Sequence, residues 1–387
     1  MVRHRLYLAP GMFGFGRLAS IDYFAHVERA LTERFRAAGT EVEIHVANVL
    51  PTASVRRRAA TLAELIAQTC GDDAPIHLLG HSTGGLDVRL LASPGSALHA
   101  PADAARWLPR LRSVTMMNTP HYGTPLATFF ATTRGQQALY LLTAFTFLGL
   151  SLGQRPMAMF RALLGLFSSG DRTFGLKIPI VEPVIASLAH VLDDVRSPEV
   201  RSYLTAIEKD QGAVVQLTPE AMDLVLAGFL DRPGVRYQST ASMAPSTARS
   251  WASTLGHPWR VASLALFTAL HAVTARFDER YPCAAMSPAS GRADATDATE
   301  AKLRAAFTEL PTLRDSDGIV PIRSQLWGEL VWCGLADHLD VLGHYRDDSE
   351  ELEPSLRHHD WLTSGSSFDD AHFAALMNAI AEGMLRA

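Results

Sequence analysis

Residues 76–91 read IHLLGHSTGGLDVRLL, and this stretch decides the fold. A short apolar run at 76–79 leads into the pentapeptide GHSTG at 80–84, and leucines at a helical spacing follow. The pattern G-x-S-x-G between a strand and a helix is typical of a nucleophile elbow, a tight turn that exposes a serine. The two glycines are needed because a Cβ at either position would clash where strand and helix backbones meet. The stretch therefore predicts that Ser82 is a nucleophile.

Strand and helix patterns alternate on both sides of that stretch. Apolar spacing predicts strands at 6–9, 42–46, 76–79 and 113–118 and helices at 23–38 and 55–69. A further strand at 235–240 and a closing helix at 373–385 resume the pattern. Such alternation indicates an α/β fold with a mainly parallel sheet and helices on both faces. We therefore expect the site at the carboxyl ends of the strands.

Residues 128–231 interrupt this alternation with helical apolar segments at 138–152, 157–167, 181–192 and 221–230. We interpret 128–231 as a helical lid inserted into an α/β core made of 1–127 and 232–387. The segment ALYLLTAFTFLGLSL at 138–152 is almost wholly apolar but too short to span a bilayer comfortably. It is either a buried lid helix or an apolar flap that contacts lipid or a hydrophobic substrate. Its candidate substrate-binding side chains are Phe145, Phe147 and Leu148. A later stretch rich in Ser, Ala, Asp and Thr, 287–299, predicts a loop.

The chain has 387 residues, of which 48% are hydrophobic, and a formal net charge of -5. This is enough apolar material for a large buried core. Because neither sign of charge dominates, the composition suggests neither a nucleic-acid partner nor an anionic membrane surface. We interpret the run Arg56–Arg58 as a solvated helix face rather than a binding patch.

Residues 3–5 (RHR) lead directly into the first predicted strand, so the amino terminus does not have the pattern of a secretory signal. On this basis we expect a cytoplasmic protein. Three cysteines, Cys70, Cys283 and Cys333, do not make a disulfide framework. Reduced thiols are the favoured interpretation, with a Cys283–Cys333 bridge left open.

A serine nucleophile needs a general base, and the base needs an acidic partner that holds its tautomer. After a nucleophile elbow the usual chain order is serine, acid, histidine. The clearest acid lies in DSDGIVP at 315–321, where an aspartate precedes a glycine turn and a short apolar run. We assign the acid to Asp317, with Asp315 as the alternate.

The base is a histidine downstream of Asp317. His338 follows an apolar stretch, 330–335, that is a candidate last strand. A histidine on the loop after that strand can lie over Ser82. His344 is its rival, and we interpret the pair His358 and His359 beside Asp360 as a surface or capping cluster.

Two backbone N–H groups are expected to bind the oxyanion. One comes from the residue after the nucleophile, Thr83. The other fits the loop APGMFG at 9–14, in which glycines flank Met12 and let its amide turn inward. We therefore assign the oxyanion hole to Met12 and Thr83.

Several motifs together resemble a known family. The blocks PGMFGFGRLASIDYF, GHSTGG, NTPHYGTPLA, SDGIVP and DHLD occur in this order. They resemble the bacterial triacylglycerol lipases whose secreted members often need a foldase chaperone, within the α/β-hydrolase superfamily. The resemblance covers the first 127 residues and about 310–345. It implies the same roles for Ser82, Asp317, His338, Met12 and Thr83.

The resemblance also implies a structural Ca²⁺ near the histidine loop, held by two aspartates and main-chain carbonyls. Asp340 falls where one of these ligands would lie. The second aspartate is not evident, since Asp294 and Asp297 lie in the predicted loop 287–299. One carboxylate does not make a calcium site, so we expect no cofactor and a structural role for Asp340.

These patterns predict a serine carboxylic-ester hydrolase that acts on hydrophobic acyl esters through an acyl-enzyme. An intracellular polyester depolymerase or an acyltransferase with the same three residues is the enzymatic alternative. A non-catalytic lipid-binding homologue is the alternative from another class, because fold does not guarantee activity. A small hydrophobic ester is the expected partner, with contact at a lipid interface left open. Relative to the resembled family, we expect a longer lid and no secretory leader.

Overall fold

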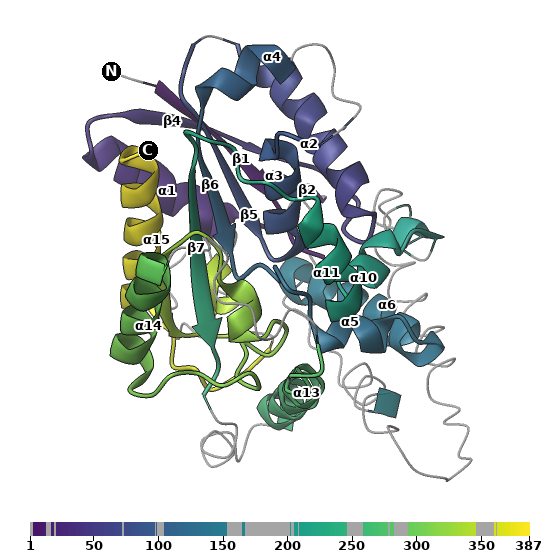
Figure 1. Ribbon diagram of the computed structural model, residues 1–387. Helices are drawn as coiled ribbons and strands as arrows, with labels where there is room; N and C mark the ends of the chain where they lie inside the picture. Colours follow the sequence, from purple (N-terminus) through teal and green to yellow (C-terminus); the bar gives the residue numbers. More distant parts are fainter. Residues whose placement is uncertain are drawn as a thin grey trace.

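A computed structural model of the chain describes residues 3–12, 17–18, 21–71, 73–96, 98, 104–152, 165–166, 202, 205–207, 209–245, 258–277, 279–281, 293–345, 360 and 362–387. A twisted sheet runs through the middle of the molecule and helices cover it from two sides (Figure 1). The strands of this sheet are β1 (Arg3–Ala9), β4 (Glu41–Val46), β5 (Ile76–His81), β6 (Leu111–Met117), β7 (Arg236–Met243) and β8 (Glu329–Leu335).

The strand order is β4-β1-β5-β6-β7-β8, and every neighbouring pair is parallel. A parallel neighbour can be reached only by a crossover connection, which is why helices separate the strands along the chain. A small antiparallel ribbon, β2 (Arg17–Leu18) with β3 (Ile21–Asp22), lies outside this sheet. The predicted α/β class with a mainly parallel sheet is confirmed.

The two faces of the sheet are covered by different helices. In β1, Leu6 and Leu8 pack in one hydrophobic cluster, whereas Tyr7 and Ala9 pack in another. The first cluster includes residues of α1 (Ala25–Ala37) and α15 (Asp370–Leu385). The second includes residues of α2 (Val55–Thr69) and α3 (Thr83–Ala92). Because successive side chains of a strand point to opposite faces, this alternation places helices on both sides, as predicted.

Helices and short loops make up the segments between β6 and β7 that the structure describes. The helices include α5 (Pro125–Phe130), α6 (Thr133–Leu152), α10 (Gly212–Gln216) and α11 (Pro219–Ala227). The helices predicted at 138–152 and 221–230 correspond to α6 and α11. Those predicted at 157–167 and 181–192 fall almost wholly outside the described residues, so the lid boundaries stay a prediction. Among the described residues, no helix combines the length and the hydropathy that crossing a bilayer requires.

The loop predicted at 287–299 is wrong from 293 onward, because α14 (Ala293–Phe307) begins there. Alanine is the strongest helix former, and Asp294 and Asp297 lie near the positive end of the helix dipole. The helix packs against β8. The remaining described helices are α4 (Ala104–Trp107), η1 (Leu108–Arg110), α13 (Pro258–Thr274), η3 (Ile322–Gln325) and η4 (Asp340–Leu342).

Candidate active site

Ser82 lies in a strained turn between β5 and α3, with φ 56° and ψ -127°. Its N–H donates to the carbonyl of Met117 at the end of β6, at 2.8 Å. A Cβ on Gly80 would lie 2.1 Å from the Gly84 oxygen, and one on Gly84 would lie 2.0 Å from the Ala9 oxygen. No real Cβ fits at such distances, so both glycines are required for the reason the sequence suggested. The turn therefore depends on close backbone packing.

Asp317 and His338, which are 21 residues apart, are in direct contact. His338 Nδ1 donates to Asp317 Oδ2 at 2.7 Å, and the two side chains are 1% and 0% exposed. The His338 backbone N–H also donates to the Asp317 carbonyl at 3.1 Å. Asp317 Oδ1 accepts the backbone N–H groups of Ile319 and Val320 at 3.0 and 2.7 Å. The carboxylate is thus buried and both of its oxygens accept hydrogen bonds.

The imidazole of His338 lies beside the elbow. The ring of His81, the residue before Ser82, is 4.7 Å from the His338 ring between centroids. His81 Nε2 is 3.0 Å from the His338 carbonyl, and Tyr23 Oη is 2.8 Å from His81 Nδ1. Burial lowers the pKa of His81 well below its usual value, so the ring is neutral. A neutral ring that donates from Nε2 must accept from Tyr23 at Nδ1.

His338 Nε2 is buried and has no hydrogen-bond partner among the described residues. Because Nδ1 carries the proton donated to Asp317, Nε2 of the neutral ring presents a lone pair. This is the arrangement that a general base requires. Ser82 Oγ and His338 Nε2 are therefore not hydrogen-bonded in this structure, and such bonds often form only when substrate binds.

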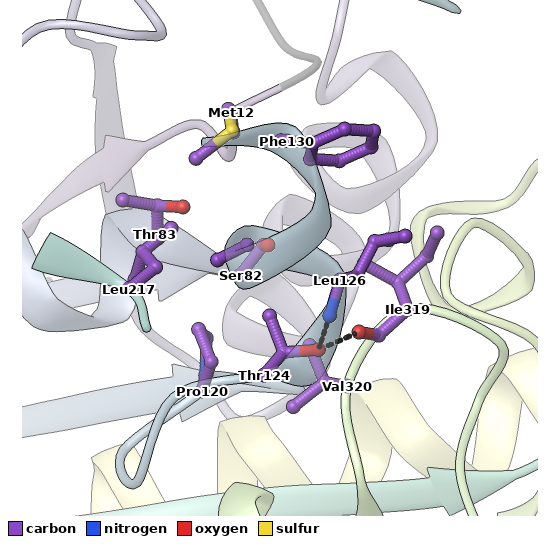
Figure 2. A pocket seen from close by; sticks show the side chains of 11 residues that line it. Met12, Ser82, Thr83, Pro120, Thr124, Leu126, Phe130, Leu217, Ile319 and Val320 are labelled. Carbon is purple, nitrogen blue, oxygen red and sulfur yellow. Dashed lines mark hydrogen bonds between the residues drawn. The ribbon is translucent and has the colours of Figure 1, made fainter. Parts of the chain in front are cut away.

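Met12 and Thr83 both line the pocket that contains Ser82 (Figure 2). Thr83 is the first residue of α3, and the first backbone N–H groups of a helix have no acceptor within it. The loop that carries Met12 lies against the nucleophile, since a Cβ on Gly11 would be 2.8 Å from Ser82 Cβ. The structure thus brings both predicted oxyanion residues to the serine.

Arg58 corrects the interpretation of Arg56–Arg58 as a solvated face. Arg56 and Arg57 are exposed, but Arg58 is 0% exposed. Its guanidinium forms an ion pair with Asp87 at 2.8 Å and donates to the carbonyl of Pro10, next to the Gly11–Met12 loop. Successive helix residues are about 100° apart, so three in a row cannot share one face. Burial raises the pKa of Asp87 to about 6, and Arg58 opposes this shift.

Asn118 was not singled out from the sequence, yet it contacts the acid. Its Nδ2 donates to Asp317 Oδ2 at 3.0 Å, and the residue follows β6 directly. Asn118 is the last residue of the strand predicted at 113–118 and the first of the block NTPHYGTPLA, and neither pattern assigns it a role. A clue was available in hindsight, because asparagine is one of the few residues that tolerate the left-handed region.

The alternates lie elsewhere. Asp315 Oδ2 accepts the N–H and the hydroxyl of Thr312 at 2.6 and 2.8 Å, which closes a turn. His344 packs edge-to-face on His26 with 5.7 Å between ring centroids. His358 and His359 lie outside the described residues.

Asp340 is the candidate calcium ligand. Its Oδ2 accepts the Asp337 N–H at 2.8 Å and the Ser366 hydroxyl at 2.6 Å. Burial and the neighbouring Asp337 raise the pKa of Asp340 well above its usual value. Asp297 is exposed on α14, and the side chain of Asp294 is not described. In the part of the chain that the structure describes, no group of three His, Cys, Asp or Glu side chains is arranged to hold a metal ion. The Asp340 oxygen Oδ2 is thus engaged by protein donors.

The pocket at Ser82 has a mainly apolar lining. Met12 and Phe130 close one side, and Ile319 and Val320 close the other (Figure 2). The Thr124 hydroxyl in its wall is already bonded to the Ile319 carbonyl at 2.6 Å. The predicted contacts Phe145, Phe147 and Leu148 fall in α6, but their side chains lie outside the described residues.

Cys70 and Cys333 are free thiols. Burial raises the pKa of Cys333 to about 11, so this thiol is protonated at neutral pH. Cys283 lies outside the described residues.

A parallel sheet with a serine elbow after one inner strand and a histidine loop after the last strand is the α/β-hydrolase arrangement. The chain has the α/β-hydrolase fold. No family model matches this α/β-hydrolase. A stretch of 95 residues is 35% identical to a triacylglycerol lipase of Vibrio cholerae serotype O1. The match covers 24% of this chain and 28% of that lipase, so the chain spans just over a quarter of its relative.

Solved structures similar to this α/β-hydrolase are lipases and esterases at low identity. Staphylococcus hyicus lipase has a TM-score of 0.48 and 15% identity, with 99% of this chain and 94% of that chain covered. Lipase 1 from Pelosinus fermentans has a TM-score of 0.47 and 17% identity, with 99% of each chain covered. EstA from Clostridium botulinum has a TM-score of 0.47 and 18% identity, with 96% and 87% covered.

Proposed function

We propose that this α/β-hydrolase is a serine carboxylic-ester hydrolase for hydrophobic acyl esters. One observation carries the proposal. A buried imidazole is held by a carboxylate through Nδ1 and presents an unpartnered Nε2 beside a strained serine turn. The chemistry of acyl transfer needs this combination, because a serine hydroxyl is a weak nucleophile until a base removes its proton.

In the proposed reaction, Ser82 Oγ attacks the acyl carbon while His338 Nε2 takes the hydroxyl proton. Asp317 holds the imidazole in its tautomer and stabilises the imidazolium that forms. The N–H groups of Met12 and Thr83 bind the oxyanion. His338 then gives the proton to the departing alkoxide, leaving an acyl-enzyme on Ser82. Water, deprotonated by the same base, attacks this ester, and the acid and free serine are released.

The apolar pocket supports a hydrophobic acyl group as substrate. Each buried CH₂ contributes about 0.8 kcal/mol to binding, so a longer chain gains more from this pocket than an acetyl group. The side chains of Phe145, Phe147 and Leu148 are proposed to extend this surface from the lid. The partial match to a protein named triacylglycerol lipase supports the same substrate class.

Labelling with a fluorophosphonate probe tests the proposal. We expect the wild type to be labelled and Ser82→Ala to be unlabelled, with ester turnover reduced by at least about 10⁴-fold. Ser113→Ala is the matched control, since Ser113 is a buried serine on β6 that bonds His77 on β5. Labelling that persists in Ser82→Ala would overturn the nucleophile. The absence of labelling in the folded wild type would favour the non-catalytic lipid-binding alternative.

A series of p-nitrophenyl esters tests the substrate class. We expect kcat/KM to rise from acetate to longer acyl chains, because the pocket lining is apolar. Best turnover on acetate would contradict this preference. A depolymerase or an acyltransferase would use the same residues, and product formation with an added alcohol that exceeds hydrolysis would identify the transferase.

A further inference from the structure

The carboxyl end of β6 contacts both halves of the site through two consecutive residues. The Met117 carbonyl accepts the N–H of Ser82 at 2.8 Å, and the side chain of Asn118 contacts Asp317. Asn118 follows the strand with a φ of 48°, in the left-handed region. Its backbone N–H donates to the Thr240 carbonyl of β7 at 3.3 Å. The end of β6 therefore contacts both the nucleophile and the acid.

The amide of Asn118 has one orientation. The Thr240 hydroxyl donates to its Oδ1 at 3.2 Å, and its Nδ2 donates to Ser242 Oγ at 2.6 Å and to Asp317 Oδ2 at 3.0 Å. A charged carboxylate only accepts hydrogen bonds, so the NH₂ must face Asp317. All four residues are 0% exposed. Buried polar groups that are fully paired are rigid, because any rotation leaves a donor or acceptor unsatisfied.

Asn118 and His338 share one oxygen of the acid. Asp317 Oδ2 accepts both Asn118 Nδ2 and His338 Nδ1, whereas Oδ1 accepts two backbone N–H groups of its own loop. The main chain of the loop is tied to the end of β7, since the Ala244 N–H donates to the Ser316 carbonyl at 2.9 Å, but neither this bond nor the loop's own N–H groups reach Oδ2. The contact from Asn118 supplies a tie at this oxygen, which orients the imidazole.

We propose that Asn118 is a positioning residue that fixes Asp317 and, through it, His338 relative to the strand end that holds Ser82. The inference rests on the proposed ester-hydrolase function. Asn118 itself does not touch the substrate in this scheme. Its loss lets the acid and the imidazole move against the elbow, which lowers the rate of the chemical step and leaves ground-state binding of the ester in place.

Two variants separate the amide from the backbone. Asn118→Gly keeps the left-handed backbone and removes the amide. Asn118→Asp keeps the shape of the side chain but sets a second carboxyl group against Asp317, and the added negative charge raises the pKa of the histidine base. Asn378→Ala is the matched control, because Asn378 is exposed on α15 and accepts a hydrogen bond from half-buried Arg34.

For Asn118→Gly we expect kcat to fall about 10- to 100-fold with KM within about twofold. For Asn118→Asp we expect the acid limb of the kcat/KM profile to move to higher pH. Among the described residues, His81 interacts with His338 and with His344, and His271 interacts with Asp317 and with Asp315. Burial lowers the pKa of His81 and His271, so neither is the source of that limb near neutral pH.

A purely structural role gives a different result. In that case both variants lose thermal stability, while the turnover per folded molecule and the pH profile match those of Asn378→Ala. That outcome would overturn the inference. The downfield proton resonance of His338 Nδ1, assigned by its loss in His338→Ala, gives a readout that needs no turnover. We expect it to shift or broaden in Asn118→Gly, and an unchanged resonance would also count against the proposal.

The two proposals fail in distinguishable ways. An inactive wild type, or an active Ser82→Ala, removes the proposed function whatever Asn118 does. An active wild type with an inactive Ser82→Ala and unchanged Asn118 variants removes only the positioning role.

Discussion

The nucleophile side and the acid–base side of this site are held by different interactions. At the elbow, the main chain of Gly80, Gly84 and Ala9 is packed so closely that no added methyl group fits. Around Asp317 the structure relies on side-chain hydrogen bonds from Asn118 and His338, which come from distant parts of the chain. The first kind of support needs glycines at two positions of one pentapeptide, although Ala9 of β1 completes the packing, and the second needs side chains from distant parts of the chain. Local patterns therefore reveal one half of such a site more readily than the other.

The largest effect on kcat is expected from replacing Asp317, the residue at the centre of the acid–base side. Asp317→Asn replaces the acceptor of the Nδ1 proton with an amide that can stabilise the wrong tautomer of His338. We expect kcat to fall by about 10⁴-fold while the fold is kept. Asp315→Asn is the control, because its carboxylate only closes a turn with Thr312, and its turnover is expected to stay within about twofold. Steady-state kinetics on one ester measure kcat for both variants. Equal losses of kcat in the two variants would refute the assignment of the acid to Asp317.

The Arg58–Asp87 ion pair supports the nucleophile side, and removing it is expected to lower the free energy of unfolding. This is the next largest expected effect. Arg58→Met leaves Asp87 as a buried carboxylate without its partner and frees the Pro10 carbonyl beside the oxyanion loop. We expect a loss of about 3–5 kcal/mol in the free energy of unfolding. Arg57→Met is the exposed neighbour, and its loss is expected to be below about 1 kcal/mol. Denaturant titrations measure both, and a loss for Arg58→Met no larger than for Arg57→Met would contradict the buried pair.

Asp87 also makes a prediction about pH. In the unfolded chain this carboxyl has its ordinary pKa of 3.8, and in the folded protein burial raises it to about 6. Between these values the folded state holds a proton that the unfolded state has released, so its contribution to stability falls as pH rises from about 4 to about 6. The change is on the order of 3 kcal/mol.

Asp87→Asn is expected to remove this part of the pH dependence in unfolding experiments from pH 4 to 7. Asp369→Asn serves as a contrast, because N–H donors of His372 lower the pKa of this exposed acid and its contribution is lost as pH falls. An unchanged slope in Asp87→Asn would show that the Arg58–Asp87 pair is not the source.

The smallest effect is expected from a change in the pocket wall, which alters neither the main-chain packing at the elbow nor the hydrogen bonds of Asp317. Phe130→Ala removes a ring from the pocket wall. We expect the preference for a long acyl ester over acetate, measured as a ratio of kcat/KM values, to fall by about 10- to 100-fold. Leu224→Ala on α11 is the control, because Leu224 is 79% exposed. If both esters lose the same factor in Phe130→Ala, the ring does not bind the acyl chain.

The sequence anticipated the parallel sheet, the elbow and the contact between Asp317 and His338, because each lies at a recognisable break between a strand and a loop. It did not reveal Asn118, since its partners Thr240, Ser242 and Asp317 are more than a hundred residues away in the chain. Hydrogen bonds of this kind follow from the strand order, and no local pattern carries them.

Arg58 was misread for a related reason. A run of three arginines indicates charge, but which one faces inward depends on what the helix packs against. Here Asp87 on α3 meets α2, and the pairing is visible only when both helices are placed on the sheet.

The strand order has a consequence for how the chain is made. After β4 pairs with β1, each later strand joins the free edge left by the previous one, from β5 to β8 in order of synthesis. The sheet can thus form strand by strand during translation, because the ribosome delivers the amino-terminal half first. Ser82 emerges early and His338 only after the last strand, so a nascent or truncated polypeptide carries the serine without the imidazole proposed to activate it.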